Sequence, residues 1–167
     1  MNNKKITKTA IFAALAIVFG YIESLIPLPV PIYGAKVGVS NTVILASLYM
    51  LGTPYAFGIM VIKTICQSLL FSGVTSFLYS FLGGLFSVAG MWILKKTNKF
   101  GTVGISVLGG CLHNVGQLVA AGILISNLNT LYYLPILLVC GVISGVVIGI
   151  ITDIVLKKLS GFSKNHL

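Results

Sequence analysis

Long apolar segments separated by short breaks dominate the sequence and predict membrane-spanning α-helices. A helix needs about 20 apolar residues to cross a bilayer, because it rises about 1.5 Å per residue through about 30 Å of hydrocarbon. Breaks fall at Pro27–Pro31, Gly52–Pro54 and Ser72–Gly73, and a helix ends at the prolines because proline cannot continue it. The sequence therefore predicts six helices, over residues 7–26, 37–51, 54–71, 74–94, 101–125 and 131–156.

The second of these segments is the shortest, with about 15 residues. An upright helix of that length does not reach across the hydrocarbon core. A half-spanning or tilted helix is therefore the alternative to a full crossing at residues 37–51.

Composition agrees with lipid as the main solvent. The chain is 57% hydrophobic and 8% charged, whereas soluble domains carry roughly 25% charged residues. No linker-like or low-complexity stretch divides it, so we expect one all-α transmembrane domain over residues 1–167. The cysteines Cys66, Cys111 and Cys140 lie in apolar segments without CxxC spacing, and we interpret them as small buried hydrophobes.

The distribution of lysine predicts the topology. All 11 basic residues are lysines, and nine of them form three clusters near the termini and in one mid-chain loop. Six crossings with a cytoplasmic N-terminus bring every cluster to the cytoplasmic side, as the positive-inside rule requires. We therefore expect a multi-pass protein of the cell membrane with both ends in the cytoplasm. The clusters are Lys4, Lys5 and Lys8; Lys95, Lys96 and Lys99; and Lys157, Lys158 and Lys164.

Polar side chains within the predicted helices gather toward the outer leaflet, and the inner halves are mostly aliphatic or small. Polar groups at membrane depth are costly, so each needs a partner or a purpose. Their position under the proline-rich loop favours an outward-opening pocket for a small molecule. The predicted substrate-binding residues are Glu23, Lys36, Asn41, Lys63, Gln67, Tyr79, His113, Asn114 and Gln117.

Structural alternatives exist for several of these residues. An ion pair between Glu23 and Lys36 across the first loop would be structural. Lys63 would snorkel if it lay at an interface, but it lies about two turns or more from either end of its helix, which favours a buried role. His113 alone is typical of a core histidine, and the presence of Asn114 and Gln117 beside it favours a ligand contact.

Enzyme functions are poorly supported. The two carboxylates, Glu23 and Asp153, are predicted on opposite sides of the membrane, whereas a magnesium–diphosphate site usually needs several clustered carboxylates. We interpret Asp153 as a solvated pair with Lys157. His113 has no second ligand at metal spacing, so we expect neither metal nor cofactor. Because the chain lacks a GxxxxGK[ST] loop, another subunit would supply any ATP hydrolysis.

Small residues mark two helix faces. Ala10 and Ala14 form a small-xxx-small pair in the first helix, and both packing within the bundle and docking of a partner membrane subunit are open interpretations. Gly141, Gly145 and Gly149 recur every four residues in the last helix. That face predicts close packing against another helix.

Four motifs carry a family resemblance. They are Lys36–Asn41 (KVGVSN), Leu78–Gly84 (LYSFLGG), His113–Gln117 (HNVGQ) and Tyr133–Pro135 (YLP). The short basic N-terminus, the alanine pair, six predicted spans and an outer loop over a polar pocket resemble the substrate-binding S components of energy-coupling factor transporters. More specifically, the chain resembles the Gx transporter family, whose members are often labelled heptaprenyl diphosphate synthase component I.

The resemblance implies a subunit that captures a small vitamin-like or precursor molecule. It also implies a transmembrane scaffold subunit and two cytoplasmic ATPases as partners. Lys63 stands where the resemblance leads us to expect arginine, and lysine lacks the planar bidentate fork of that side chain. A membrane accessory protein of isoprenoid-quinone or flavin-linked redox metabolism is the alternative. A channel is disfavoured because the inner half lacks a polar lining.

Overall fold

The protein is described by a computed structural model that covers residues 3–25, 38–125 and 132–164. All regular structure in these ranges is helical, which confirms the all-α prediction for this part of the chain. The helices are α1 (Asn3–Ser24), α2 (Val39–Met50), α3 (Thr53–Gln67), α4 (Gly73–Lys96), α5 (Thr102–Ile125) and α6 (Leu134–Lys164), with a π-helical turn η1 (Ser68–Ser72) between α3 and α4.

Five stretches of the described helices are long and apolar enough to cross a membrane: Asn3–Ser24, Thr53–Phe71, Thr75–Lys96, Thr102–Leu124 and Leu134–Leu159. Helix α2 has only 12 residues, or about 18 Å of helix against about 30 Å of hydrocarbon. The multi-pass helical prediction is therefore confirmed for five spans. A sixth full crossing by α2 remains a prediction.

Helix boundaries differ from the predicted ones in two instructive places. Helix α6 continues past residue 156 to Lys164, because lysine is a good helix former even where the apolar pattern has ended. The predicted break at Ser72–Gly73 is not a loop. Instead, η1 leads directly into α4 through Gly73, whose φ of 74° is readily adopted by glycine.

Lysines at one end of the bundle lie over aromatic rings. The Nζ atom of Lys5 at the start of α1 lies 5.9 Å from the ring centre of Tyr55 at the start of α3. Lys95 in the last turn of α4 lies 4.6 Å from the ring centre of Tyr49, near the end of α2. These contacts bring the lysine-rich ends of α1 and α4 together with the α2–α3 connection.

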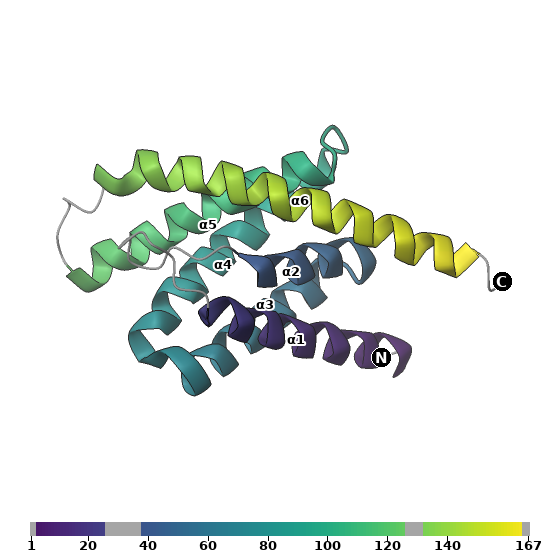
Figure 1. Cartoon of the computed structure of the whole chain (residues 1–167), viewed down its shortest axis with the longest axis horizontal. Coiled ribbons are helices and arrows are strands. Elements are labelled where there is room, and N and C mark those ends of the chain that lie inside the picture. The colour runs from purple at the N-terminus through teal and green to yellow at the C-terminus, as the bar shows by residue number, and fades with distance from the viewer. Residues whose placement is uncertain (1–2, 26–37, 126–131, 165–167) are drawn as a thin grey trace.

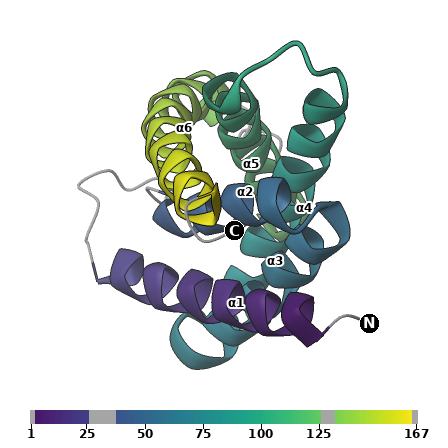
Figure 2. The ribbon, with the colours of Figure 1, turned by 90° about the vertical axis from the view of Figure 1, so that its right-hand side faces the viewer.

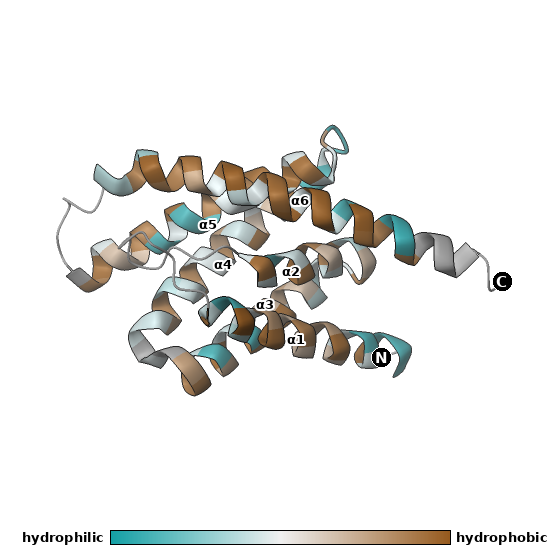
Figure 3. Cartoon of the chain, viewed as in Figure 1, coloured by the Kyte–Doolittle hydropathy of each residue, from teal (hydrophilic) through white to brown (hydrophobic). Residues whose placement is uncertain are grey.

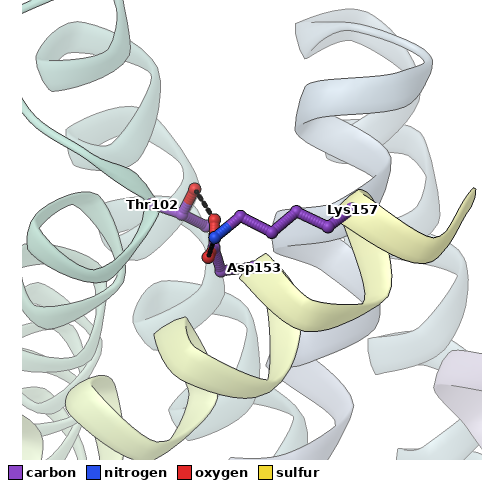
Figure 4. Close-up of polar contacts among 3 residues, drawn as sticks. All are labelled: Thr102, Asp153 and Lys157. Atoms are coloured by element: carbon purple, nitrogen blue, oxygen red, sulfur yellow. Dashed lines mark hydrogen bonds and ion pairs between the residues drawn. The ribbon is translucent and has the colours of Figure 1, made fainter. Parts of the chain in front are cut away.

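The same end of the bundle holds the start of α5 and the later part of α6. The Thr102 hydroxyl donates to Asp153 Oδ1 at 3.4 Å, and Lys157 Nζ lies 2.7 Å from Asp153 Oδ2 (Figure 4). Figure 1 shows the N-terminal end of α1 and the C-terminal end of α6 on the same side. All the described lysine clusters thus share one end, as the predicted topology requires. That this end faces the cytoplasm stays a prediction.

Helices α4, α5 and α6 approach one another backbone to backbone at glycines. A Cβ atom added at Gly145 of α6 would lie 2.6 Å from Val107 Cα of α5, and one at Gly149 would lie 2.6 Å from Val103 Cα. On the other side of α5, a Cβ at Gly116 would lie 2.5 Å from the Leu82 carbonyl oxygen of α4. Figure 1 shows α5 and α6 side by side along their length. The predicted close packing of the glycine face is confirmed.

Helix α1 lies against α2 and α3, at an incline to α5 and α6 (Figure 2). Its buried face consists of Ala13, Ala16, Gly20 and Glu23.

The outer surface of the long helices is apolar. Figure 3 shows hydrophobic residues along the middle of α6 and hydrophilic residues at the start of α1. On α6, Val139, Ile143, Ile150 and Ile154 are each about half exposed or more, and they repeat at helical spacing. Such a surface is suited to lipid rather than to water.

Candidate functional site

A small polar cavity lies where α2, α4, α5 and α6 meet. Its volume is about 20 Å³, which is room for about one water molecule. Gly38 and Leu45 of the α2 segment and Met91 of α4 contribute to its wall. The polar side chains that line it are Asn41, Ser87, Ser106, His113, Asn114 and Ser144. Three of the predicted substrate-binding residues, Asn41, His113 and Asn114, are therefore brought together.

Asn114 joins the cavity to the α5–α6 interface. Its Nδ2 atom donates to the Leu137 carbonyl oxygen of α6 at 2.5 Å. The close approach depends on Gly141, where an added Cβ would lie 3.0 Å from Asn114 Nδ2. The Ser144 hydroxyl donates to the Gly141 carbonyl oxygen at 3.3 Å. The amide of Asn114 is thus held in one orientation at the edge of the cavity.

His113 and Gln117 share the face of α5 that contacts α4, as their spacing predicts. A Cβ atom at Gly83 would lie 2.9 Å from His113 Cε1 and 3.1 Å from Gln117 Cγ. Gln117 is buried, one turn beyond the cavity. Tyr79 lies one turn before Gly83 on α4 and is half-buried. Neither Gln117 nor Tyr79 lines the cavity.

The buried carboxylate of Glu23 lies at the N-terminus of α2. The backbone N–H of Gly38 donates to its Oε1 atom, and the Ser40 hydroxyl donates to its Oε2 atom at 3.4 Å. Helix N-termini leave backbone N–H groups without intrahelical partners and attract negative charge. Lys36 lies outside the described residues, and so does the predicted Glu23–Lys36 pair.

Two further polar side chains are buried on α3. Lys63 is 8% exposed and Gln67 is 6% exposed, which confirms that Lys63 is buried rather than snorkelled to an open surface. A Cβ atom at Gly20 of α1 would lie 1.4 Å from Gln67 Nε2, so the Gln67 amide rests directly on that glycine. Lys63, Gln67 and Glu23 are not among the residues that line the α2–α6 cavity, and their substrate-binding role stays a prediction.

The two carboxylates of the chain lie near opposite ends of the bundle. Glu23 is in the last turn of α1, and Asp153 lies at the lysine-rich end, where the first turn of α1 also lies. The predicted Asp153–Lys157 pair is confirmed (Figure 4). In the part of the chain that the structure describes, no three His, Cys, Asp or Glu side chains come together as a metal site would require.

Sequence reasoning missed the serines of the cavity. Ser87 and Ser106 are both 3% exposed, and neither they nor Ser144 are among the predicted substrate-binding residues. The cavity therefore extends into the half of the bundle that was predicted to be mostly aliphatic or small. Helical spacing carried a signal, because Ser106, Gly110 and His113 fall on one face of α5. That face points at the cavity.

Long apolar helices, a lipid-type outer surface and a buried polar interior define a polytopic helical membrane protein. The family profile described as heptaprenyl diphosphate synthase component I matches residues 12–155, and the chain belongs to this family. The family expected from the motifs is thereby confirmed. Comparison with curated proteins and with solved structures gave no match.

Proposed function

We propose that the chain is the membrane-embedded substrate-binding subunit of an energy-coupling factor type uptake transporter in the cell membrane. The observation that carries the proposal is the polar cavity walled by four helices inside a lipid-exposed bundle. Its ligand is a small vitamin-like or precursor molecule. A transmembrane scaffold subunit and two cytoplasmic ATPases would complete the transporter, because the chain has no GxxxxGK[ST] loop of its own.

Asn41, His113 and Asn114 are the proposed ligand contacts within the cavity. Amide and imidazole groups supply both donors and acceptors, so they can orient a hydrogen-bonding molecule. Lys63 does not line this cavity, so the anionic or acceptor-rich ligand expected from its ammonium requires a site that reaches α3. Gln117 is close enough to His113, on the same face, to extend the site along α5.

Ligand binding requires the cavity to widen, because pockets for drug-sized molecules have volumes of about 300–1,000 Å³. Helices α5 and α6 are in backbone contact at Gly145. In contrast, α2 meets α6 through a side chain, since a Cβ at Gly38 would lie 3.0 Å from the Ile148 Cδ1 methyl group. Side chains rotate more easily than backbones separate. We therefore assign the moving wall to α2.

The outer face of α1 supports the docking of a scaffold subunit. Ala10 and Ala14 are exposed, whereas Ala13 and Ala16 of the same helix are buried. Small residues let a neighbouring helix approach closely in lipid. Because both alanines are exposed in the described bundle, they are accessible to a helix of a partner subunit.

A retained ligand tests the binding site. Native mass spectrometry of gently purified protein is expected to detect a bound small molecule in the wild type, and Asn41→Ala and His113→Ala should lose it. Ser24→Ala is the matched control, because Ser24 is exposed and its hydroxyl donates to the Tyr21 carbonyl oxygen of its own helix. If both cavity variants retained the same molecule, the cavity would not be its binding site.

Partner capture tests the docking face. Affinity purification from native membranes is expected to bring down a membrane scaffold and two ATPases. Ala14→Trp should abolish this capture, and Val139→Trp on the exposed face of α6 should leave it intact. Equal capture by both variants would exclude α1 as the docking helix.

The family description favours a second candidate, a membrane accessory of heptaprenyl diphosphate or flavin-linked redox metabolism. Its words "component I" support a role beside a separate catalytic component, and the separation of Glu23 from Asp153 supports the absence of a self-contained synthase site. Co-purification with a prenyl-chain-lengthening enzyme, instead of ATPases, would favour this candidate.

A further inference from the structure

Helix α2 is held at both ends by charged side chains from its neighbours. At its N-terminus, the buried Glu23 carboxylate of α1 accepts hydrogen bonds from the Gly38 backbone and the Ser40 hydroxyl. At its C-terminus, Lys95 Nζ of α4 donates to the Leu48 carbonyl oxygen at 2.7 Å.

The signs of the two charges match the helix dipole. An α-helix carries about half a positive charge at its N-terminus and about half a negative charge at its C-terminus. Carboxylate at the first end and ammonium at the second are therefore both favourable. Each also satisfies a terminal backbone group that has no partner within the helix. For a helix of only 12 residues, these ends are a large share of its backbone groups.

The contact between Glu23 and Gly38 holds part of the cavity wall in place. Gly38 and Asn41 line the cavity, and the Asn41 backbone N–H donates to the Gly38 carbonyl oxygen at 2.8 Å. Gly38 has a φ of 82°, a left-handed conformation that glycine adopts without strain. The carboxylate that fixes Gly38 therefore also fixes the first turn of the α2 wall.

We propose that Glu23 and Lys95 form a charge clamp on α2, and that Glu23 is a positioning residue that couples α1 to the wall of the cavity. Glu23 lies on the buried face of α1, and Ala10 and Ala14 lie on the exposed face of the same helix. A shift of α1 displaces Glu23, and with it Gly38 and Asn41. The transport consequence, in which partner docking at α1 opens or closes the cavity, rests on the proposed function.

Thiol accessibility measures the clamp without any ligand. Ser87 lines the cavity from α4 and is 3% exposed, so Ser87→Cys in a background with the three native cysteines replaced by alanine is a buried reporter. A small methanethiosulfonate reagent is applied to the full-length protein in lipid nanodiscs. Glu23→Ala is expected to raise the labelling rate about tenfold or more, because a charge-assisted contact is lost. Lys95→Met should also raise it.

Matched controls separate the clamp from general loosening. Ser24→Ala changes the residue next to Glu23, and Lys96→Met removes the neighbouring lysine, which lies over the Trp92 ring of its own helix. Both should label at the rate of the reporter alone. Glu23→Gln keeps a hydrogen-bond acceptor but loses the charge, so it should be labelled at an intermediate rate. This variant replaces Glu23→Ala in the experiment if Glu23→Ala does not fold.

Labelling of Glu23→Gln and Lys95→Met at the control rates would overturn the clamp. Because no ligand or partner is present, that result would leave the proposed function standing. Conversely, faster labelling of Glu23→Gln and Lys95→Met would support the clamp. If the wild type then retained no ligand in mass spectrometry, the clamp would stand and the proposed function would be contradicted.

Discussion

Replacement of Gly145 by alanine tests whether backbone contact between α5 and α6 stabilises the bundle. The added Cβ would lie 2.6 Å from Val107 Cα and 3.0 Å from the Ser106 carbonyl oxygen. Carbon atoms prefer separations of about 3.5–4.0 Å, so the helices must move apart by about 1 Å, and a gap of that size loses up to about half of each dispersion contact. Since both neighbours are backbone atoms, no side-chain rotation relieves the clash.

The magnitude follows from two opposing effects. Overpacking costs about 1–3 kcal/mol, and alanine in a helix is favoured over glycine by about 1 kcal/mol. Gly58→Ala on α3 is the matched control, because a Cβ there meets nothing within 4 Å and gains the same helix propensity. The difference between the two variants therefore isolates the packing cost, about 1–3 kcal/mol.

A thiol-reactive dye offers the assay, since Cys111 lies half-buried at the α5–α6 interface. Cys140 is exposed and not buried as predicted, so it is replaced by alanine in every variant. Purified variants are heated with the dye, and the midpoint of the fluorescence rise is compared. A chain of this length shifts by roughly 2–4 °C per kcal/mol, so Gly145→Ala should melt about 5 °C below Gly58→Ala. Equal midpoints would refute the backbone-contact argument.

Three further variants probe other contacts. Gly20→Ala should destabilise by about 1–2 kcal/mol because its Cβ displaces the buried Gln67 amide, which lies 1.4 Å from that position; Gln67→Ala in the same chain should restore the melting midpoint, and no rescue would contradict the contact. Lys157→Ala should change the midpoint by less than about 3 °C, because an exposed ion pair such as Lys157–Asp153 contributes at most about 1 kcal/mol. Asn98→Cys in the α4–α5 connection should react with an impermeant maleimide only in inside-out vesicles; reaction in right-side-out cells would reverse the predicted topology.

The sequence predicted the helices because apolar length and the breaks at proline and glycine are local properties. The spacing of Gly141, Gly145 and Gly149 likewise placed one face against another helix, and the structure confirms that contact. The continuation of α6 to Lys164 could not be read from hydropathy, since a helix that has left the lipid no longer needs apolar residues.

The sequence predicted how deep in the membrane each candidate site residue lies, but not which neighbouring helix its side chain faces. Lys63 and His113 lie at comparable predicted depth in the membrane, yet only His113 lines the cavity between α2, α4, α5 and α6. Which helix a face meets depends on the packing of all the helices, and a single sequence does not encode that directly. Glu23 is the clearest case, because its main partner is the backbone N–H of Gly38, and every residue except proline has such a group.

The kind of contact between helices explains why the cavity lies beside α2. Where α5 and α6 meet at Gly110 and Gly145, the nearest neighbours are backbone atoms, so these two helices cannot separate without losing many contacts together. Where α1 meets α3, α3 meets α4, and α4 meets α5 at the cavity, the corresponding neighbours are flexible side chains. These are Gln67 against Gly20, Met60 against Gly84 and Met91 against Gly109. The cavity lies at the boundary of the two groups, with His113 fixed on the rigid side and Asn41 on the adjustable side. A site that must close around a ligand gains from this division, because the rigid wall keeps its geometry while the other wall moves.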